Sequence, residues 1–115
     1  MDGIEHKDLK ERTKQFAVAG VKFYQGLGKD TESQVCGPQF LRSATSVGAN
    51  TRSAFRGRSS REFKAKLGIV IEEADECGFW LELMIASGIV RSSQVQPLLK
   101  ESDELVSIFT SIVKR

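Results

Sequence analysis

The chain of 115 residues has room for one domain, because most domains contain about 100–150 residues. Its 40% hydrophobic and 28% charged residues are typical of a soluble globular protein and exclude a disordered chain. The formal net charge is +2, and the single histidine, His6, leaves little material for acid–base catalysis. We therefore expect a single domain over residues 1–115 without enzymatic activity.

Two features predict a cytoplasmic protein. The N-terminal residues are charged from Asp2 onward and no apolar run follows them, so we expect no secretory signal. The longest apolar stretch, around residues 69–71, is far shorter than the roughly 20 residues that cross a membrane. Cys36 and Cys77 could form a disulfide in an oxidising compartment, but Cys77 lies on an apolar helical stripe, where a reduced thiol packs as a small hydrophobe.

Apolar and small residues at helical spacing predict a first helix from about residue 6 to residue 27, with this inward face: Leu9, Phe16, Gly20, Phe23 and Leu27. Charged residues between them are typical of a solvated face. We expect a weak ion pair between Asp8 and Arg12 at four-residue spacing. A second weak pair is expected between Glu11 and Lys14.

A second helix is predicted from the residues Phe40, Ala44, Val47, Thr51 and Ala54. Its start has two interpretations. Thr31 and Gln34 have the spacing of a capping box, which favours a start near Thr31 and a kink at Pro38. Alternatively the helix begins at Pro38, because a proline disfavours helical backbone at the preceding residue. Small residues on this helix would let a neighbouring helix approach closely: Ser43, Ala44, Ser46, Gly48 and Ala49.

The third helix has the clearest pattern. A capping box formed by Ser59 and Glu62 predicts its start, and Gly88 predicts its end. Its inward stripe is continuous: Phe63, Leu67, Val70, Ala74, Cys77, Leu81 and Met84. Further apolar residues lie off this stripe: Ile69, Ile71, Phe79, Trp80, Leu83 and Ile85. Either a broader core or another subunit must bury them, and we expect a subunit to cover at least part.

A fourth helix is expected to start near Ser92 or Ser93, with a capping box formed by Ser93 and Gln96 and with Pro97 in its first turn. Its inward residues are Leu98, Leu105, Phe109 and Ile112. Four such helices joined by short turns predict an all-α fold, an antiparallel up-down-up-down four-helix bundle. Because its core is small, assembly would add stability.

The net charge conceals a local separation. Residues 42–66 have a balance of +6, and residues 67–88 have a balance of −5. The basic turn around Arg58 has three interpretations: contacts to phosphate groups, ion pairs with the acidic segment that fix helix register, or solvated surface charge. The acidic residues do not predict a metal site, because no histidine accompanies them and they spread around the helix. Neither a nucleophile elbow nor a phosphate-binding loop is present, so we expect no cofactor.

Two segments at a fixed separation carry a family resemblance: residues 41–50 (LRSATSVGAN) and residues 71–83 (IEEADECGFWLEL). Over about residues 8–113 the chain resembles the four-helix-bundle proteins associated with intervening sequences in bacterial 23S ribosomal RNA genes. The resemblance implies a left-handed bundle that assembles into rings of five. A related branch, the accessory variability determinant proteins of diversity-generating retroelements, forms basic barrels that engage a reverse transcriptase and nucleic acid.

The motif positions carried over from this resemblance are Arg42, Ser43, Asn50, Glu73, Asp75 and Trp80. We expect structural roles for them, with Asn50 half-buried and hydrogen-bonded and Trp80 anchoring a subunit contact. One position departs from the family pattern. An acidic residue often follows the Ala-Asn motif, and here that site has Ser53 followed by Ala54, which would leave a partner arginine free.

These observations predict a non-enzymatic, homo-oligomeric bundle, a pentamer, that serves as an interaction or scaffold module. The alternative is RNA or nucleoprotein binding through a ring of pooled arginines, for which the candidates are Arg52, Arg56, Arg58 and Arg61.

Overall fold

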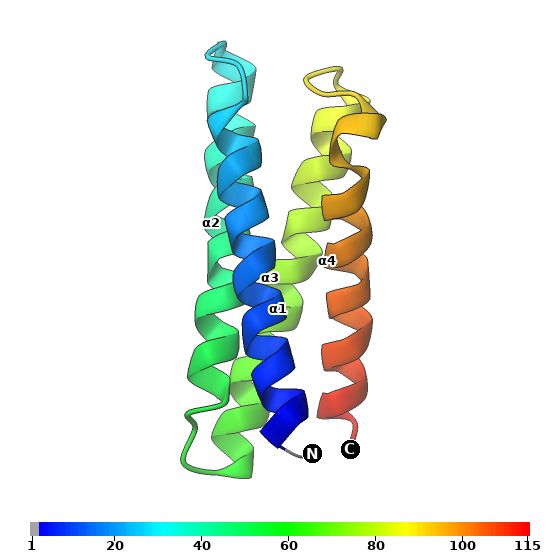
Figure 1. Cartoon of the computed structure of the whole chain (residues 1–115). Coiled ribbons are helices and arrows are strands. Elements are labelled where there is room, and N and C mark those ends of the chain that lie inside the picture. Colours follow the sequence, from blue (N-terminus) through cyan, green and yellow to red (C-terminus); the bar gives the residue numbers. More distant parts are fainter. Residues whose placement is uncertain (1–2) are drawn as a thin grey trace.

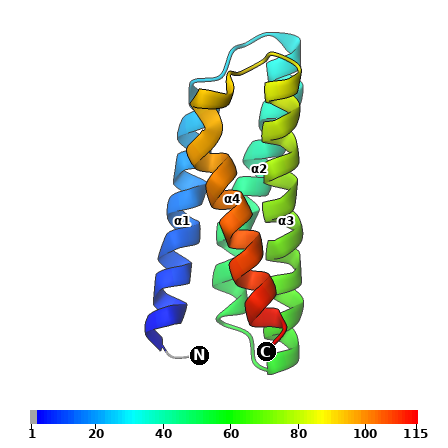
Figure 2. The same cartoon turned by 90° about the vertical axis from the view of Figure 1, so that its right-hand side faces the viewer.

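A computed structural model describes the backbone of residues 3–115 and the side chains of residues 8–115. It contains four helices and, within residues 3–115, no strand: α1 (Gly3–Gln25), α2 (Thr31–Ala54), α3 (Ser60–Ala86) and α4 (Ser92–Val113). Consecutive helices run antiparallel, and the turns between them alternate between the two ends of the molecule (Figures 1 and 2). The predicted all-α four-helix bundle is confirmed. No helix in the described part combines the length and apolar character of a membrane span.

The bundle is elongated, with extents of 45 × 21 × 19 Å. Helix α2 packs against both α1 and α3, and α4 packs mainly against α3, with only a slight contact between α1 and α4. Each helix therefore packs mainly against its neighbours in the sequence, and the α1–α2 pair has a long outer face (Figure 1).

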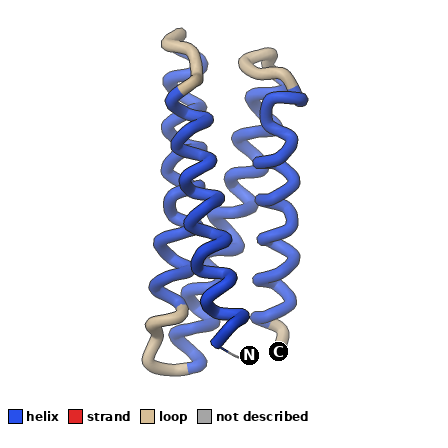
Figure 3. The backbone as a smooth tube through the Cα atoms, in the orientation of Figure 1, coloured by secondary structure: helices blue, strands red, loops and turns tan. Residues whose placement is uncertain are grey.

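Helix α2 begins at Thr31, so the earlier of the two predicted starts is correct, and the helix continues through Pro38 (Figure 3). The predicted capping box is wrong, however. Asp30 is the N-cap, and its carboxylate accepts hydrogen bonds from the Ser33 backbone N–H at 3.1 Å and from Ser33 Oγ at 2.9 Å. These bonds favour the charged carboxylate and lower the pKa of Asp30. Gln34 instead donates to the carbonyl of Gly28 at 2.9 Å.

Helix α3 starts and ends as predicted. Ser59 is its N-cap and accepts from the backbone N–H of Glu62 at 3.1 Å. At the other end, Gly88 has a φ of +79°, in the left-handed region where a residue with a Cβ would be strained. The helix therefore stops at Ala86, and the chain turns into α4.

The predicted capping box of α4 is wrong, although the helix does start at Ser92. The Arg91 backbone N–H donates to Gln94 Oε1 at 2.7 Å, so the capping pair lies two positions earlier than expected. Pro97 consequently lies in the second turn instead of the first. Since proline has no N–H, one backbone hydrogen bond of this turn is absent.

The apolar stripes predicted for α2, α3 and α4 form most of the core, although Phe63 at the start of the α3 stripe is only partly buried. All five residues predicted on α2 are buried: Phe40, Ala44, Val47, Thr51 and Ala54. On α1, Phe23 is half-buried and packs edge-to-face on Phe40, with ring centroids 5.4 Å apart. Three buried hydroxyl residues were not predicted: Thr13, Ser33 and Ser102. Thr13 and Ser102 donate to carbonyls of their own helix and Ser33 donates to Asp30, which satisfies all three hydroxyl groups.

Small residues bring α1 and α2 together, as predicted from α2. A Cβ added to Gly20 would lie 2.9 Å from the Cβ of Ala44, and one added to Gly48 would lie 3.3 Å from the carbonyl oxygen of Thr13. These distances leave no room for larger side chains, so the two helix backbones approach closely.

The bundle covers half of the off-stripe apolar residues of α3. Ile71, Trp80 and Ile85 are partly buried against the core. The other three remain exposed in the single chain, by 40% for Ile69, 55% for Phe79 and 37% for Leu83.

Candidate nucleic-acid interface

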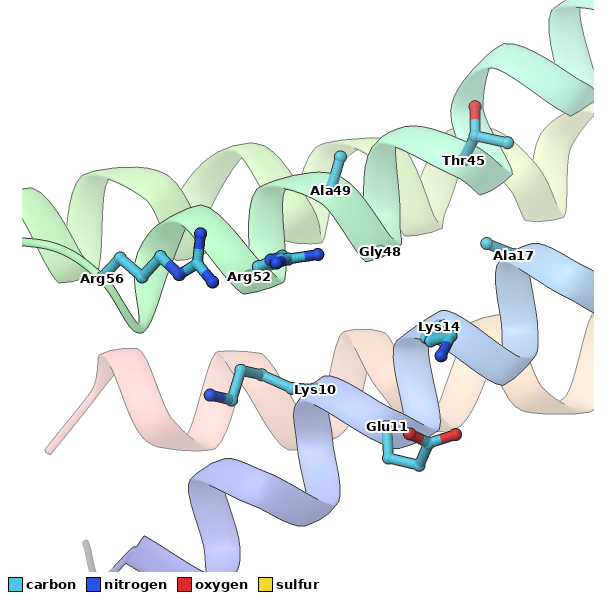
Figure 4. Close-up of a pocket in the computed structure, with 9 residues that line it drawn as sticks. All are labelled: Lys10, Glu11, Lys14, Ala17, Thr45, Gly48, Ala49, Arg52 and Arg56. Atoms are coloured by element: carbon cyan, nitrogen blue, oxygen red, sulfur yellow. The ribbon is translucent and has the colours of Figure 1, made fainter.

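The outer face of the α1–α2 pair contains a groove of about 560 Å³ (Figure 4). Residues of α1, of α2 and of the turn after α2 line it: Lys10, Glu11, Lys14, Ala17, Thr45, Gly48, Ala49, Arg52 and Arg56. Three of these residues, Ala17, Gly48 and Ala49, have little or no side chain. They leave open space between the two helices beside the longer side chains of the lining (Figure 4).

The charge of this groove comes from two pairs of cations, each pair four positions apart in the sequence: Lys10 and Lys14 on α1, and Arg52 in the last turn of α2 with Arg56 in the turn that follows this helix. Figure 4 shows the two pairs on opposite sides of the groove. None of the four forms an ion pair with a carboxylate among the side chains of residues 8–115. The predicted Glu11–Lys14 pair is also absent there, because Glu11 accepts a hydrogen bond from Gln15 Nε2 at 2.7 Å.

A second depression of about 330 Å³ continues this surface toward the α2–α3 turn. It shares Ala49, Arg52 and Arg56 with the first, and Lys66 of α3 adds a further cation to its lining. Ser53, where the family pattern often has an acidic residue, lies in the same lining. Glu62 is the one carboxylate that lines this second depression.

The four arginines predicted as nucleic-acid contacts are not all in one place. Arg52 and Arg56 line both depressions. Arg58, in the turn, and Arg61, in the first turn of α3, are exposed but line neither. Their role stays a prediction.

Sequence reasoning missed the two lysines of the groove, because α1 was interpreted as a solvated face. The available signal was a matching four-residue spacing of cations, on α1 and at the end of α2. That signal becomes informative only when the register of α1 on α2 is known.

The predicted pairing of Asp8 with Arg12 is wrong. Arg12 instead reaches across to α4, where Nε and Nη2 each lie 2.7 Å from one oxygen of Glu101, and Nη2 lies 3.0 Å from Glu104. These partners raise the pKa of Arg12. A bidentate contact between a guanidinium and a carboxylate makes a stronger ion pair than a local pair on one helix, which explains why Arg12 binds Glu101 instead of Asp8.

A second charged cluster joins α2 to α3. Arg42 lies 3.1 Å from Glu73 Oε2 through Nη1 and 3.1 Å from Glu76 Oε2 through Nη2, and it also donates to Ser43 Oγ. Burial raises the pKa of Glu73, as does its neighbour Glu76, whereas Arg42 opposes the shift. The pKa of Glu76 is lowered by its hydrogen bonds to Glu73 and Arg42. Two of the motif residues, Arg42 and Glu73, therefore contact each other within one chain.

The remaining motif residues lie apart from the groove. Asn50 is half-buried and donates from Nδ2 to the carbonyl of Ser46 at 3.0 Å. Asp75 is exposed and lines a separate groove of about 410 Å³ between α3 and α4. Trp80 packs edge-on against Phe79, with ring centroids 5.1 Å apart.

Groups with catalytic or metal-binding chemistry do not gather in the described part of the chain. Within residues 8–115, no three or more His, Cys, Asp or Glu side chains are placed to hold a metal ion. The side chain of His6 lies outside the described residues. Cys36 and Cys77 are buried and free, and burial raises the pKa of Cys77 to about 12, so its thiol stays protonated at neutral pH.

The fold and this surface place the chain in a class of small helical bundles with a cationic face. A family model described as 23S rRNA-intervening sequence protein matches residues 5–111, and the chain belongs to this family. The chain is also similar to the crystal structure of a protein with unknown function from the S23 ribosomal protein family of Bacteroides thetaiotaomicron VPI-5482. That similarity has a TM-score of 0.88 and 34% identity, over 96% of this chain and 98% of the other. No curated protein matches the chain. Neither description names an enzymatic activity.

Proposed function

We propose that the protein is a homo-oligomeric helical-bundle scaffold without enzymatic activity, assembled as a ring of five. The observation that carries this proposal is the exposed apolar surface of α3. Phe79 is 55% exposed, Leu83 is exposed one turn further on, and Trp80 beside them is only half-buried. Clustered aromatic and aliphatic residues on a soluble surface are typical of interaction sites.

A second copy of the chain is the partner that this surface fits best. The bundle is small, so burying α3 in a subunit contact adds apolar area that a single chain of 115 residues lacks. In a ring, the α3 surface of one copy meets a different surface of the next copy. The resemblance to bundles that form rings of five supports the same stoichiometry.

Light scattering coupled to size-exclusion chromatography tests this assembly. We expect the wild-type protein to elute as a pentamer at micromolar concentration and the Phe79→Ser variant to shift toward monomer, with unchanged helix content because Phe79 lies outside the core. Val18→Ser is the matched control, since Val18 is an exposed apolar residue on α1. A stable wild-type monomer would contradict the proposal, and so would a Phe79→Ser variant that remains pentameric.

A second candidate function, RNA binding, is favoured by the cationic groove between α1 and α2. Its four cations lack carboxylate partners within the described side chains, which leaves their charge available to phosphate groups. A ring would multiply this surface fivefold and raise the avidity for a long polyanion.

Titration of a structured RNA at two salt concentrations tests the second candidate. Because each phosphate contact releases a bound counterion, we expect the affinity to fall steeply as salt increases. Absence of binding at low salt, or binding that salt does not weaken, would contradict this function.

A further inference from the structure

We infer that the α1–α2 groove binds the sugar-phosphate backbone of double-stranded RNA, and that Lys10 and Lys14 are direct phosphate contacts alongside Arg52 and Arg56. This inference rests on the second candidate function and specifies its site and its ligand. It adds α1 to the proposed binding surface, whereas the candidates predicted from the sequence were four arginines outside this helix.

The cations of the groove are arranged in two pairs that face each other. Residues four positions apart on an α-helix are separated by roughly 6 Å along its axis and lie on the same face, as Lys10 and Lys14 do on α1. Arg52, in the last turn of α2, and Arg56, in the turn that follows, form the second pair across the groove (Figure 4). Two facing pairs of cations suit a ligand whose negative charges repeat along a strand.

The four cations of the groove form no ion pair with any described side chain. The salt bridges among described side chains use Arg12 and Arg42, neither of which lines the groove. The carboxylate that does line it, Glu11, is hydrogen-bonded to Gln15. A phosphate therefore needs to displace no internal ion pair in order to reach the lysines and arginines.

The lining of the groove favours a duplex over a single strand. No aromatic residue lines the groove, although proteins that bind single strands generally stack bases on aromatic side chains. A single strand would lose conformational freedom on binding here and gain no stacking in return. In a duplex the phosphates are already held in place, and backbone contacts alone suffice.

Apart from its charged residues, the groove lacks groups suited to reading bases. The hydroxyl of Thr45 donates to the carbonyls of Leu41 and Arg42, and the other uncharged lining residues are alanine and glycine. The major groove of an A-form RNA duplex is too deep and narrow for side chains to read, so we expect the lysines and arginines to contact phosphates and recognition to be independent of sequence.

Fluorescence anisotropy tests the inference with a labelled RNA duplex and, separately, one of its strands chosen to be unstructured. Each is titrated with the full chain at several salt concentrations. We expect the duplex to bind more tightly than the strand at every salt concentration. For each protein, the logarithm of the association constant for the duplex is plotted against the logarithm of the salt concentration. In the Lys10→Ala/Lys14→Ala variant, the slope of this plot should become shallower by about 2, or about 1 per lost phosphate contact.

The matched control is Lys22→Ala/Lys100→Ala, which removes the same charge from exposed positions outside the groove. Equal slopes in the two double variants, with the duplex still bound, would overturn the groove assignment and leave RNA binding standing. Tighter binding of the single strand would overturn the duplex assignment. Failure of both RNAs to bind the wild-type protein would remove the second candidate function together with this inference.

Discussion

The ion-pair partner of Arg12 could not be predicted from the sequence. Four-residue spacing indicates Asp8 as its partner, yet its guanidinium is bound to Glu101, 89 positions away in the chain. The local pair would join two side chains of one helix, whereas the observed pair joins the first helix to the last. Spacing rules predict only contacts within one helix, so they cannot predict a partner on another helix.

A double-mutant cycle on Arg12 and Glu101 measures this contact. The side chains are 31% and 26% exposed, so solvent still screens the pair, and we expect a coupling free energy of about 1 kcal/mol from urea unfolding of the two Ala variants and their double variant. All four proteins are compared at one concentration, because assembly alters apparent stability.

The control for this cycle is Lys14→Ala, an exposed residue of the same helix without an ion pair to any described side chain. Its effect should stay within about 0.5 kcal/mol. A coupling free energy near zero would mean that the pair orients the helices without stabilising them.

At the scale of helices, apolar periodicity was sufficient to locate all four. The stripe of α3 was predicted almost completely, with six of its seven residues buried, because these residues repeat without interruption and Ser59 and Gly88 mark the two ends of the helix. The predicted N-caps were wrong by one position for α2 and by two positions for α4. Several Ser, Thr, Asp and Gln residues compete at each start, and the choice among them depends on how the preceding turn is folded.

Substitutions at two glycines test the close packing of α1 on α2. Gly20→Ala would place a Cβ 2.9 Å from that of Ala44, and we expect net destabilisation because overpacking costs about 1–3 kcal/mol, more than the roughly 1 kcal/mol gained in helix propensity. Gly68→Ala in α3 is the matched control. A Cβ there meets nothing within 4 Å, so this variant should be more stable by about 0.5–1 kcal/mol.

Thermal or urea unfolding of the two variants gives the comparison directly. Stabilisation by both substitutions would show that α1 can move away from α2 at no cost, which would contradict a rigid groove between them.

For the whole molecule, the fold class could be predicted from the sequence, whereas the cationic groove could not. Arg52 and Arg56 were predicted because they lie in a segment of obvious positive charge. Lys10 and Lys14 alternate with acidic residues in the sequence, so their own segment has almost no net charge. Only the antiparallel packing of α1 on α2 places these lysines beside the arginines.

The sequence predicts that α3 has more apolar residues than one buried stripe contains. It does not predict how much of this apolar surface stays exposed. The bundle itself covers Ile71, Trp80 and Ile85 in part, and this depends on how closely α2 and α4 flank α3. The apolar surface that remains exposed is smaller and includes Phe79 and Leu83.

The alternation of the turns has a practical consequence. The start of α1 and the end of α4 lie at the same end of the molecule as the α2–α3 turn, which contains Arg58 (Figures 1 and 2). An affinity tag or fluorescent fusion at either end of the chain would therefore be attached at the end of the bundle toward which the cationic surface extends. A label introduced in the turns at residues 26–30 or 87–91 would be attached at the opposite end, about the length of a helix away.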